Sequence, residues 1–290
     1  YTLALFAQDE IKLLRNLQAL IGVRYIYHEN FKNHATPNVA LMYKPGKFNF
    51  RASYAAGFRT PTLSELYATD IAKKNDRLTI GNLDLKPEKN NYFSLSAEYV
   101  HERFSVSVNA FYNNIRDMID YNTIATGDKA MEQYGHKEVR QRDNIAEAKV
   151  HGINVSANAY LGAGFNLSGG YTHLNTQDVE LEQPIDKSIK NAYNINAQWA
   201  HSWKIYRLNI NLNGRFNSKR FSKSYGYAPE YQLWDLNTRH SFNLKSVIIE
   251  PGCGMENLFD YMDDRPYNSN YATLTPGRSF YISLSLKFKS

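Results

Sequence analysis

The stretch Ser279–Phe288, with the sequence SFYISLSLKF, decides the fold. Its apolar side chains, from Phe280 to Phe288, occupy every second position, and serine, tyrosine and lysine occupy the positions between them. Because successive side chains of a β-strand point to opposite faces, this period of two predicts a strand with one apolar and one polar face. The same alternation recurs in residues 48–54, 104–110 and 208–213. The sequence therefore predicts an all-β protein.

The composition is that of a chain that is polar on average and rich in aromatic residues. Its 290 residues include 22 Tyr and 15 Phe, and the mean hydropathy is −0.54. A transmembrane helix needs about 18 or more consecutive apolar residues, and the sequence has no such stretch. A transmembrane strand needs only about 9–11 residues, half of which face water. The composition thus excludes a membrane-spanning helix and permits a membrane-spanning barrel.

The links between the predicted strands alternate between short and long. Short links fall at residues 13–16, 44–47, 101–103, 161–164, 202–204 and 245–246, and long polar links fall at residues 29–35, 59–88, 125–137, 178–189, 219–229 and 261–275. Short turns at one rim and long loops at the other are typical of outer-membrane barrels, whose short turns lie in the periplasm. On the polar face, charged residues such as Arg51, Glu98 and Lys287 are expected to point into the lumen, because a charge facing lipid costs up to about 2–4 kcal/mol.

About thirteen strands are predicted. They span residues 1–12, 17–28, 36–44, 47–58, 89–100, 103–124, 138–160, 164–177, 190–201, 204–218, 230–244, 247–260 and 276–288. The first strand starts at the long-loop rim and the last ends at the short-turn rim. Bacterial single-chain barrels have an even number of strands. We therefore expect at least one preceding strand, and a signal peptide, to be missing from the sequence.

Three segments resemble the C-terminal barrel of TonB-dependent receptors. They are AGFRTPTLSELY at residues 56–67, GNLDLKPE at residues 81–88, and GMENLFD at residues 254–260, which is followed by Arg265-Pro266-Tyr267 and Pro276-Gly277-Arg278. Their order and spacing match the family. The residues that match the family motifs are Phe58, Arg59, Pro61, Asn82, Leu85, Pro87, Asn257, Leu258 and Phe259.

The resemblance implies a fold, a location and a function. Plug-bearing receptor barrels have 22 strands, so the thirteen predicted strands would be part of such a barrel, with the plug and the TonB-contacting segment absent. Residues 1–290 are then one C-terminal barrel domain with long extracellular loops at residues 59–88, 125–137, 178–189, 219–229 and 261–275. The implied function is TonB-dependent import of a ferric siderophore, haem or cobalamin across the bacterial outer membrane. The implied partners are the TonB complex, outer-membrane lipid or lipopolysaccharide, and a metal-chelate ligand.

Candidate ligand contacts come from the loops. They are Arg59, Tyr67, Arg77, Lys219, Arg220, Tyr225 and Tyr227. Basic and aromatic side chains attract an anionic chelate through charge steering and stacking, although basic loops also pair with lipopolysaccharide or stay solvated. Haem importers of the family have a histidine ligand between the two motif boxes. No histidine lies between Phe58 and Asn82, so haem ligation by this loop is not expected, and the boxes are interpreted as family structure.

Other function classes have no support in the sequence. The net charge of +6 is dispersed, without the Lys/Arg tract that a nucleic-acid phosphate backbone would need. The single cysteine, Cys253, excludes an internal disulfide, and no histidine pair has metal-site spacing. No catalytic motif is present. We therefore predict neither an enzyme, nor a cofactor, nor a resident metal.

Two alternatives remain open from the sequence. One is a passive channel or adhesin barrel of about 14 strands without a plug. The other is a soluble all-β binding module that buries its apolar face in a core. Alternation alone cannot distinguish them from a receptor, because both a membrane barrel and a soluble sheet alternate.

Overall fold

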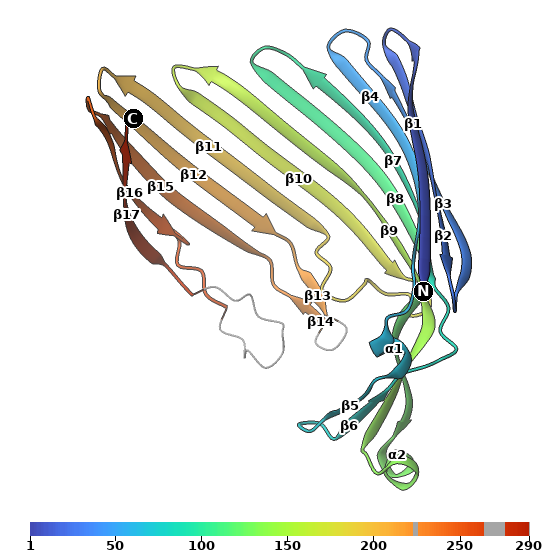
Figure 1. Ribbon diagram of the computed structural model, residues 1–290. Coiled ribbons are helices and arrows are strands. Elements are labelled where there is room, and N and C mark those ends of the chain that lie inside the picture. Colours follow the sequence, from blue (N-terminus) through green and yellow to red (C-terminus); the bar gives the residue numbers. More distant parts are fainter. Residues whose placement is uncertain (223–225, 264–275, 290) are drawn as a thin grey trace.

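The computed structural model describes residues 1–222, 226–263 and 276–289 (Figure 1). Thirteen long antiparallel strands pair in chain order into one sheet, which we call the wall. Its strands are β1 (Thr2–Leu14), β2 (Leu17–His28), β3 (Lys32–Tyr43), β4 (Phe48–Arg59), β7 (Glu88–Val100), β8 (Phe104–Thr126), β9 (Glu138–Gly162), β10 (Phe165–Asp178), β11 (Asn191–Trp203), β12 (Tyr206–Asn217), β15 (Tyr231–Asn243), β16 (Val247–Glu256) and β17 (Ser279–Phe288). The predicted all-β class and the number of wall strands are confirmed.

Two of the predicted strand boundaries were wrong by four residues. The third strand begins at Lys32, because Lys32 takes a left-handed conformation (φ 63°) that closes a tight turn and pairs with His28. The link before it is therefore Glu29–Phe31, and not a long loop. The strand predicted to end at residue 260 ends at Glu256, because Asn257 is also left-handed (φ 52°).

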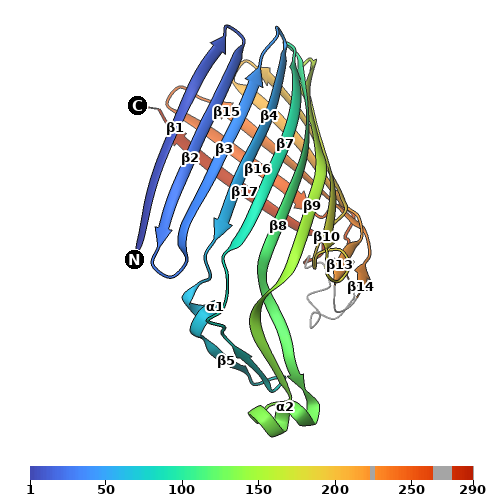
Figure 2. The same cartoon turned by 90° about the vertical axis from the view of Figure 1, so that its right-hand side faces the viewer.

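All the long links lie at one rim of the wall, together with the three-residue turn between β2 and β3, and the other short turns lie at the opposite rim (Figures 1 and 2). The predicted alternation of link lengths is confirmed except at residues 29–35, where a long link was predicted and a tight turn is found. The long links contain regular elements of their own, which are α1 (Leu63–Tyr67), β5 (Thr69–Ala72), β6 (Arg77–Ile80), α2 (Gly127–Tyr134), β13 (Arg220–Ser222) and β14 (Gly226–Ala228). Among the described residues, no helix is long and apolar enough to cross a membrane.

The apolar face of the wall is the more exposed one, whereas in a soluble sheet the apolar face is buried. Along β8, Phe104, Val106 and Val108 are exposed, whereas Ser105 and Ser107 between them are half-buried. Side chains on the concave face of a curved sheet crowd together and lose accessible area, so the polar face is the sheltered, concave one. Within the described residues, the buried hydrophobic clusters lie where the long links pack on the extended ends of β8 and β9, and not beneath the wall. A soluble module would instead cover its apolar face with a core.

Aromatic rings form two belts on the apolar face. Near the short-turn rim, Tyr99 contacts Phe48 and Phe104, with ring centroids 4.9 and 5.6 Å apart. Toward the long-loop rim, Tyr54 contacts Phe93 at 4.8 Å. Aliphatic side chains occupy the rows between these belts. Aromatic girdles that flank an apolar band mark the two interfaces of a membrane barrel, where rings with polar edges meet the lipid head groups.

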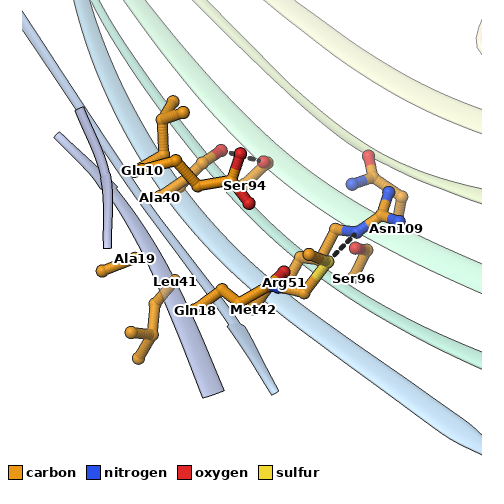
Figure 3. A pocket seen from close by; sticks show the side chains of 12 residues that line it. Glu10, Gln18, Ala19, Ala40, Leu41, Met42, Arg51, Ser94, Ser96 and Asn109 are labelled. Atoms are coloured by element: carbon orange, nitrogen blue, oxygen red, sulfur yellow. Dashed lines mark hydrogen bonds between the residues drawn. The ribbon is translucent and has the colours of Figure 1, made fainter. Parts of the chain in front are cut away.

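The polar face is a hydrogen-bonded surface. Ser53 and Ser94 share a hydrogen bond of 2.6 Å between β4 and β7, and Lys287 forms an ion pair of 2.6 Å with Glu250. A hollow of about 480 Å³ opens on this face, and in it Arg51 donates to the sulfur of Met42 at 3.3 Å. The side chains that line it are drawn in Figure 3. Serine, asparagine and paired charges therefore line the concave side, as expected for a lumen.

Candidate functional site

Arg59 is the centre of an ion-pair node at the base of the longest loop. It is the last residue of β4 and lies opposite Glu88, the first residue of β7. Its Nε and Nη2 donate to the Glu88 carboxylate at 2.7 and 2.6 Å, and its Nη1 and Nη2 donate to Glu65 at 2.9 and 3.1 Å. Paired, charge-assisted hydrogen bonds of this kind fix both distance and orientation. The guanidinium thus binds two carboxylates of the protein itself.

Glu65 joins this node to the short helix α1. Thr62 is the N-cap, and its hydroxyl accepts from the Glu65 amide at 3.2 Å, while Glu65 accepts from the Thr62 amide at 2.8 Å. This reciprocal capping box stabilises a helix that is too short to persist alone. Burial raises the pKa of Glu65, but the hydrogen bonds from Arg59 and Thr62 outweigh it, so that this pKa lies below its ordinary value.

Apolar residues of the first two family segments, residues 56–67 and 81–88, pack beside the ion pairs. Leu66 and Leu85 are buried against Ile119 of β8, and Pro61 and Pro87 are also buried. Gly81 approaches the helix so closely that a Cβ there would lie 2.5 Å from the carbonyl oxygen of Leu66. Only glycine fits this contact without movement of the backbone.

The remaining residues of the first two motif segments are Asn82 and Phe58. Asn82 donates its amide to the carbonyl of Glu65 at 3.0 Å, and its side chain accepts from the amide of Asp84 at 2.9 Å. The ring of Phe58 stacks on His34 with centroids 4.4 Å apart. The structure therefore places Arg59, Pro61, Asn82, Leu85 and Pro87 at the foot of the loop, and Phe58 contacts β3 instead.

Asn144 of β9 fastens this loop to the neighbouring hairpin, and sequence reasoning did not identify it. Its Oδ1 accepts from the amide of Lys86 at 2.7 Å, and its Nδ2 donates to the carbonyls of Lys86 and Asp117 at 2.9 and 2.6 Å. The β8–β9 pairing is irregular at Asp117, which has a φ of 56°. The Asn144 side chain bonds the Asp117 carbonyl at this irregularity. No periodicity or motif marked this asparagine, because its partners are distant in sequence.

The rest of the loop docks onto the β8–β9 hairpin. Strand β6 pairs in parallel with β9 from Arg77 to Ile80. Next to it, the Asp76 carboxylate lies 2.9 Å from Nδ1 of the His136 ring. Beneath them, Ala130 of α2 and Val139 are fully buried. We call residues 60–87 together with residues 117–144 the platform. Figure 2 shows it projecting beyond the wall.

The proposed ligand contacts are distributed over two parts of the rim. Tyr67, at the end of α1, is 61% exposed, and Arg77 is half-buried in β6. On the other loop Lys219 is exposed, Arg220 is half-buried in β13, and Tyr227 of β14 is 56% exposed. Tyr225 lies outside the described residues, as do Arg265, Pro266 and Tyr267 of the third family segment. The β5–β6 and β13–β14 hairpins leave the rim separately (Figures 1 and 2).

The third motif forms a turn at the end of β16. Asn257 is buried and left-handed, and its side chain accepts from the amide of Tyr261 at 2.9 Å and donates to the Tyr261 carbonyl at 2.7 Å. The amide of Leu258 donates to the carbonyl of Trp234 at 2.6 Å, and Phe259 packs edge-on against the Trp234 ring at 6.4 Å. This motif therefore shapes the end of a strand.

Metal ligands do not gather in the described part of the chain, where no group of three His, Cys, Asp or Glu side chains could hold an ion. The histidines near the long-loop rim instead contact neighbouring groups. His34 Nε2 is 2.8 Å from the carbonyl of Phe31, and His173 Nδ1 is 2.8 Å from the Asn191 side chain.

The curved antiparallel wall, its outward apolar face and its two aromatic belts define a transmembrane β-barrel architecture. The chain belongs to the TonB-dependent receptor-like β-barrel family, whose model matches residues 1–258.

Solved receptors share this fold. A mutant of the ferric enterobactin receptor of Pseudomonas aeruginosa has a TM-score of 0.79 and 20% identity, over 99% of this chain and 45% of that one. The siderophore receptor PirA of P. aeruginosa has a TM-score of 0.73 and 17% identity, over 100% and 48%. The ferric preacinetobactin receptor BauA of Acinetobacter baumannii has a TM-score of 0.72 and 18% identity, over 99% and 42%. The chain thus spans less than half the length of each.

Proposed function

We propose that this chain supplies the wall and loops of an outer-membrane receptor for TonB-dependent import of a ferric siderophore. The observation on which this rests is the combination of an outward apolar face with a polar concave face and a docked platform that projects beyond the long-link rim. Family membership supports receptor activity. The family is one of receptors and not of enzymes, in keeping with the sequence.

A ferric siderophore is proposed as the ligand because of three similar structures. One is a ferric enterobactin receptor, the second is the siderophore receptor PirA, and the third is the ferric preacinetobactin receptor BauA. Haem and cobalamin, which the family resemblance also implied, have no specific support, and the loop lacks the histidine that a haem importer would have there. Residues 1–290 are proposed to act as a single barrel domain with extracellular loops. The plug would contact the polar face, TonB would act through that plug, and lipid and lipopolysaccharide would contact the apolar face.

The ligand contacts that we propose exclude Arg59. Its guanidinium is occupied by Glu65 and Glu88, so an anionic chelate would have to displace two carboxylates to reach it. The proposed contacts are therefore Tyr67, Arg77, Lys219, Arg220, Tyr225 and Tyr227. Lysine and arginine would steer the anion toward the loops, and tyrosine rings would stack on its aromatic or planar groups.

The test uses the full-length protein. Ferric enterobactin, haemin and cyanocobalamin would be titrated against purified receptor, and uptake of radioactive iron would be compared in cells with and without TonB. We expect saturable binding of the ferric siderophore and uptake only with TonB. Uptake that persists without TonB would instead support the passive channel.

A pair of variants tests the loop contacts. The double variant Lys219→Gln with Tyr227→Ala should weaken siderophore binding about tenfold or more, because it removes a charge and a stacking ring. Lys129→Gln, an exposed lysine of α2, is the matched control and should bind like the wild type. Equal affinity in all three proteins would show that these loop residues are not ligand contacts.

A further inference from the structure

Positive charge is concentrated at the short-turn rim. The residues between wall strands at that rim, with the one after β17, include seven exposed cations: Arg15, Lys44, Lys47, Arg103, Lys204, Lys245 and Lys289. Their one acidic neighbour in these turns is Glu102. The long links are balanced by comparison, since residues 60–87 contain four basic and four acidic side chains. The asymmetry between the rims is therefore large.

This charge is not neutralised by the described protein. Among residues 1–222, 226–263 and 276–289, no ion pair with a side-chain carboxylate involves any of the seven cations. Lys289 donates only to neutral acceptors, the side-chain oxygen of Asn243 and the carbonyl of Leu244, at 2.5 and 2.7 Å. The turns are short, so the cations stay within a few residues of the strand ends. They therefore lie close to the aromatic belt near the short-turn rim.

An apolar groove opens on the outward face just inside this rim. It has a volume of about 580 Å³ and is lined by Phe165, Leu167, Ala197, Trp199, Ile210 and Leu212, among others. From the groove a series of rings runs along β11 to the turn that contains Lys204. Trp199 and Trp203 are 6.1 Å apart, and Trp203 stacks on Tyr206 at 5.5 Å. The groove, the rings and Lys204 lie in the same order as the acyl chain, the interface and the head group of a phospholipid.

We propose that the short-turn rim binds anionic phospholipids of the membrane leaflet on that side, with head-group phosphates on the turn cations and an acyl chain in the groove. The proposal rests on the proposed function, because it requires the wall to span a membrane. Charge complementarity selects the occupant, since exposed lysines and arginines near a membrane surface are attracted to anionic lipid. Tryptophan and tyrosine rings favour the boundary between head groups and acyl chains.

The experiment measures lipid retained by the full-length protein in detergent, by native mass spectrometry. The probes are phosphatidylglycerol and phosphatidylcholine with identical acyl chains, and inorganic phosphate serves as a competitor. The rim variant combines Lys44→Gln, Lys47→Gln, Arg103→Gln and Lys204→Gln. The control variant neutralises four exposed lysines at the other rim, Lys73→Gln, Lys74→Gln, Lys129→Gln and Lys190→Gln.

We expect the wild type and the control variant to prefer phosphatidylglycerol, and the rim variant to bind it about tenfold more weakly, while phosphatidylcholine binding stays unchanged. The preference should also vanish near 1 M salt, where the Debye length is about 3 Å. Ala197→Trp, which fills the groove, should reduce retention of both lipids.

Three outcomes would overturn the proposal. One is equal retention of both lipids by the wild type, and another is an equal loss in the rim and control variants. The third is full displacement by inorganic phosphate, which would assign the rim to soluble anions. Detergent partitioning separates this failure from that of the proposed function: a receptor that partitions into detergent and binds siderophore without lipid preference contradicts only the lipid proposal. A protein that stays in buffer contradicts both.

Discussion

Arg59 and Glu88, which lie 29 positions apart in the sequence, face each other as register partners at the ends of β4 and β7. Two parallel hydrogen bonds of 2.7 and 2.6 Å join the guanidinium to the carboxylate. The same carboxylate accepts from the amide of Ile119 at 2.8 Å. The strand ends, helix α1 and the β8–β9 hairpin are therefore held at one point, and the platform is anchored there.

Replacing Arg59 with lysine should loosen the platform without unfolding the wall. A lysine ammonium keeps the charge, but it cannot bind Glu65 and Glu88 in two bidentate pairs. Because Arg59 is partly exposed, we expect a modest cost of about 1–2 kcal/mol in the local opening of residues 60–87. Limited proteolysis of the full-length protein should show about a tenfold faster cut in this loop. Arg103→Lys, in a short turn, is the control, and equal cleavage of both variants would argue against the node.

Asn144 offers a prediction about the distinction between an amide and a carboxylate. In Asn144→Asp the carboxylate can still accept from the Lys86 amide, but it would face the carbonyls of Lys86 and Asp117. The second carboxylate oxygen and the two carbonyls are all acceptors, with no hydrogen between them. We expect this contact to cost about 1 kcal/mol or more beyond the Asn144→Ala truncation. Hydrogen exchange at the amides of Lys86 and Glu88 reports the difference. Faster exchange in Asn144→Ala than in Asn144→Asp would contradict the assigned donor geometry.

The platform should open in acid because of Glu65. Its pKa is below the ordinary value when the loop is docked, so the docked form binds fewer protons than the open form. The stabilisation is fully present above the ordinary glutamate pKa of about 4.3 and is lost as pH falls through the lowered value. Hydrogen exchange corrected for intrinsic rates should therefore be constant from neutral pH to about pH 5 and rise below about pH 4.

Glu65→Gln is the matched variant for this pH dependence. Glutamine can still accept from the Thr62 amide, but it carries no charge to pair with Arg59. Its loop should exchange faster than the wild type at neutral pH and should show a weaker rise in acid. A wild-type acid profile in this variant would assign the opening to another group.

Asn257 separates backbone conformation from side-chain bonding. Asn257→Gly tolerates the positive φ of 52° but loses both hydrogen bonds to Tyr261. Asn257→Ala loses the bonds and adds backbone strain of about 1 kcal/mol. The denaturation midpoint of the full-length protein should therefore fall in the order wild type, glycine, alanine. If the alanine variant is as stable as the glycine variant, the left-handed conformation costs nothing at this position.

The wall could be predicted from the sequence because its determinants are local. Alternation with period two, as in Ser279–Phe288, requires only that neighbouring side chains point to opposite faces. Link lengths then placed all the long loops at one rim, and the thirteen strands followed. The boundaries failed at Lys32 and Asn257, where single left-handed residues set the ends of strands.

The motif residues could be found in the sequence, but their roles could not. Arg59 was expected to face a ligand, and the structure pairs it with Glu65 and Glu88. Only the folded loop brings acidic side chains next to Arg59. Glu88 is 29 positions away in the sequence, so no periodic pattern relates it to Arg59. Asn144 was missed for the same reason.

The sequence by itself determined the strand class, the number of wall strands and the separation of the two rims, because periodicity and link length are properties of neighbouring residues. Only the tertiary structure decided which face is outward. Alternation is identical in a soluble sheet and in a barrel, and the curvature of the paired strands is what shelters the polar face. It also decided that residues 60–87 dock on β9, because contacts such as Asn144 with Lys86 join segments 58 positions apart.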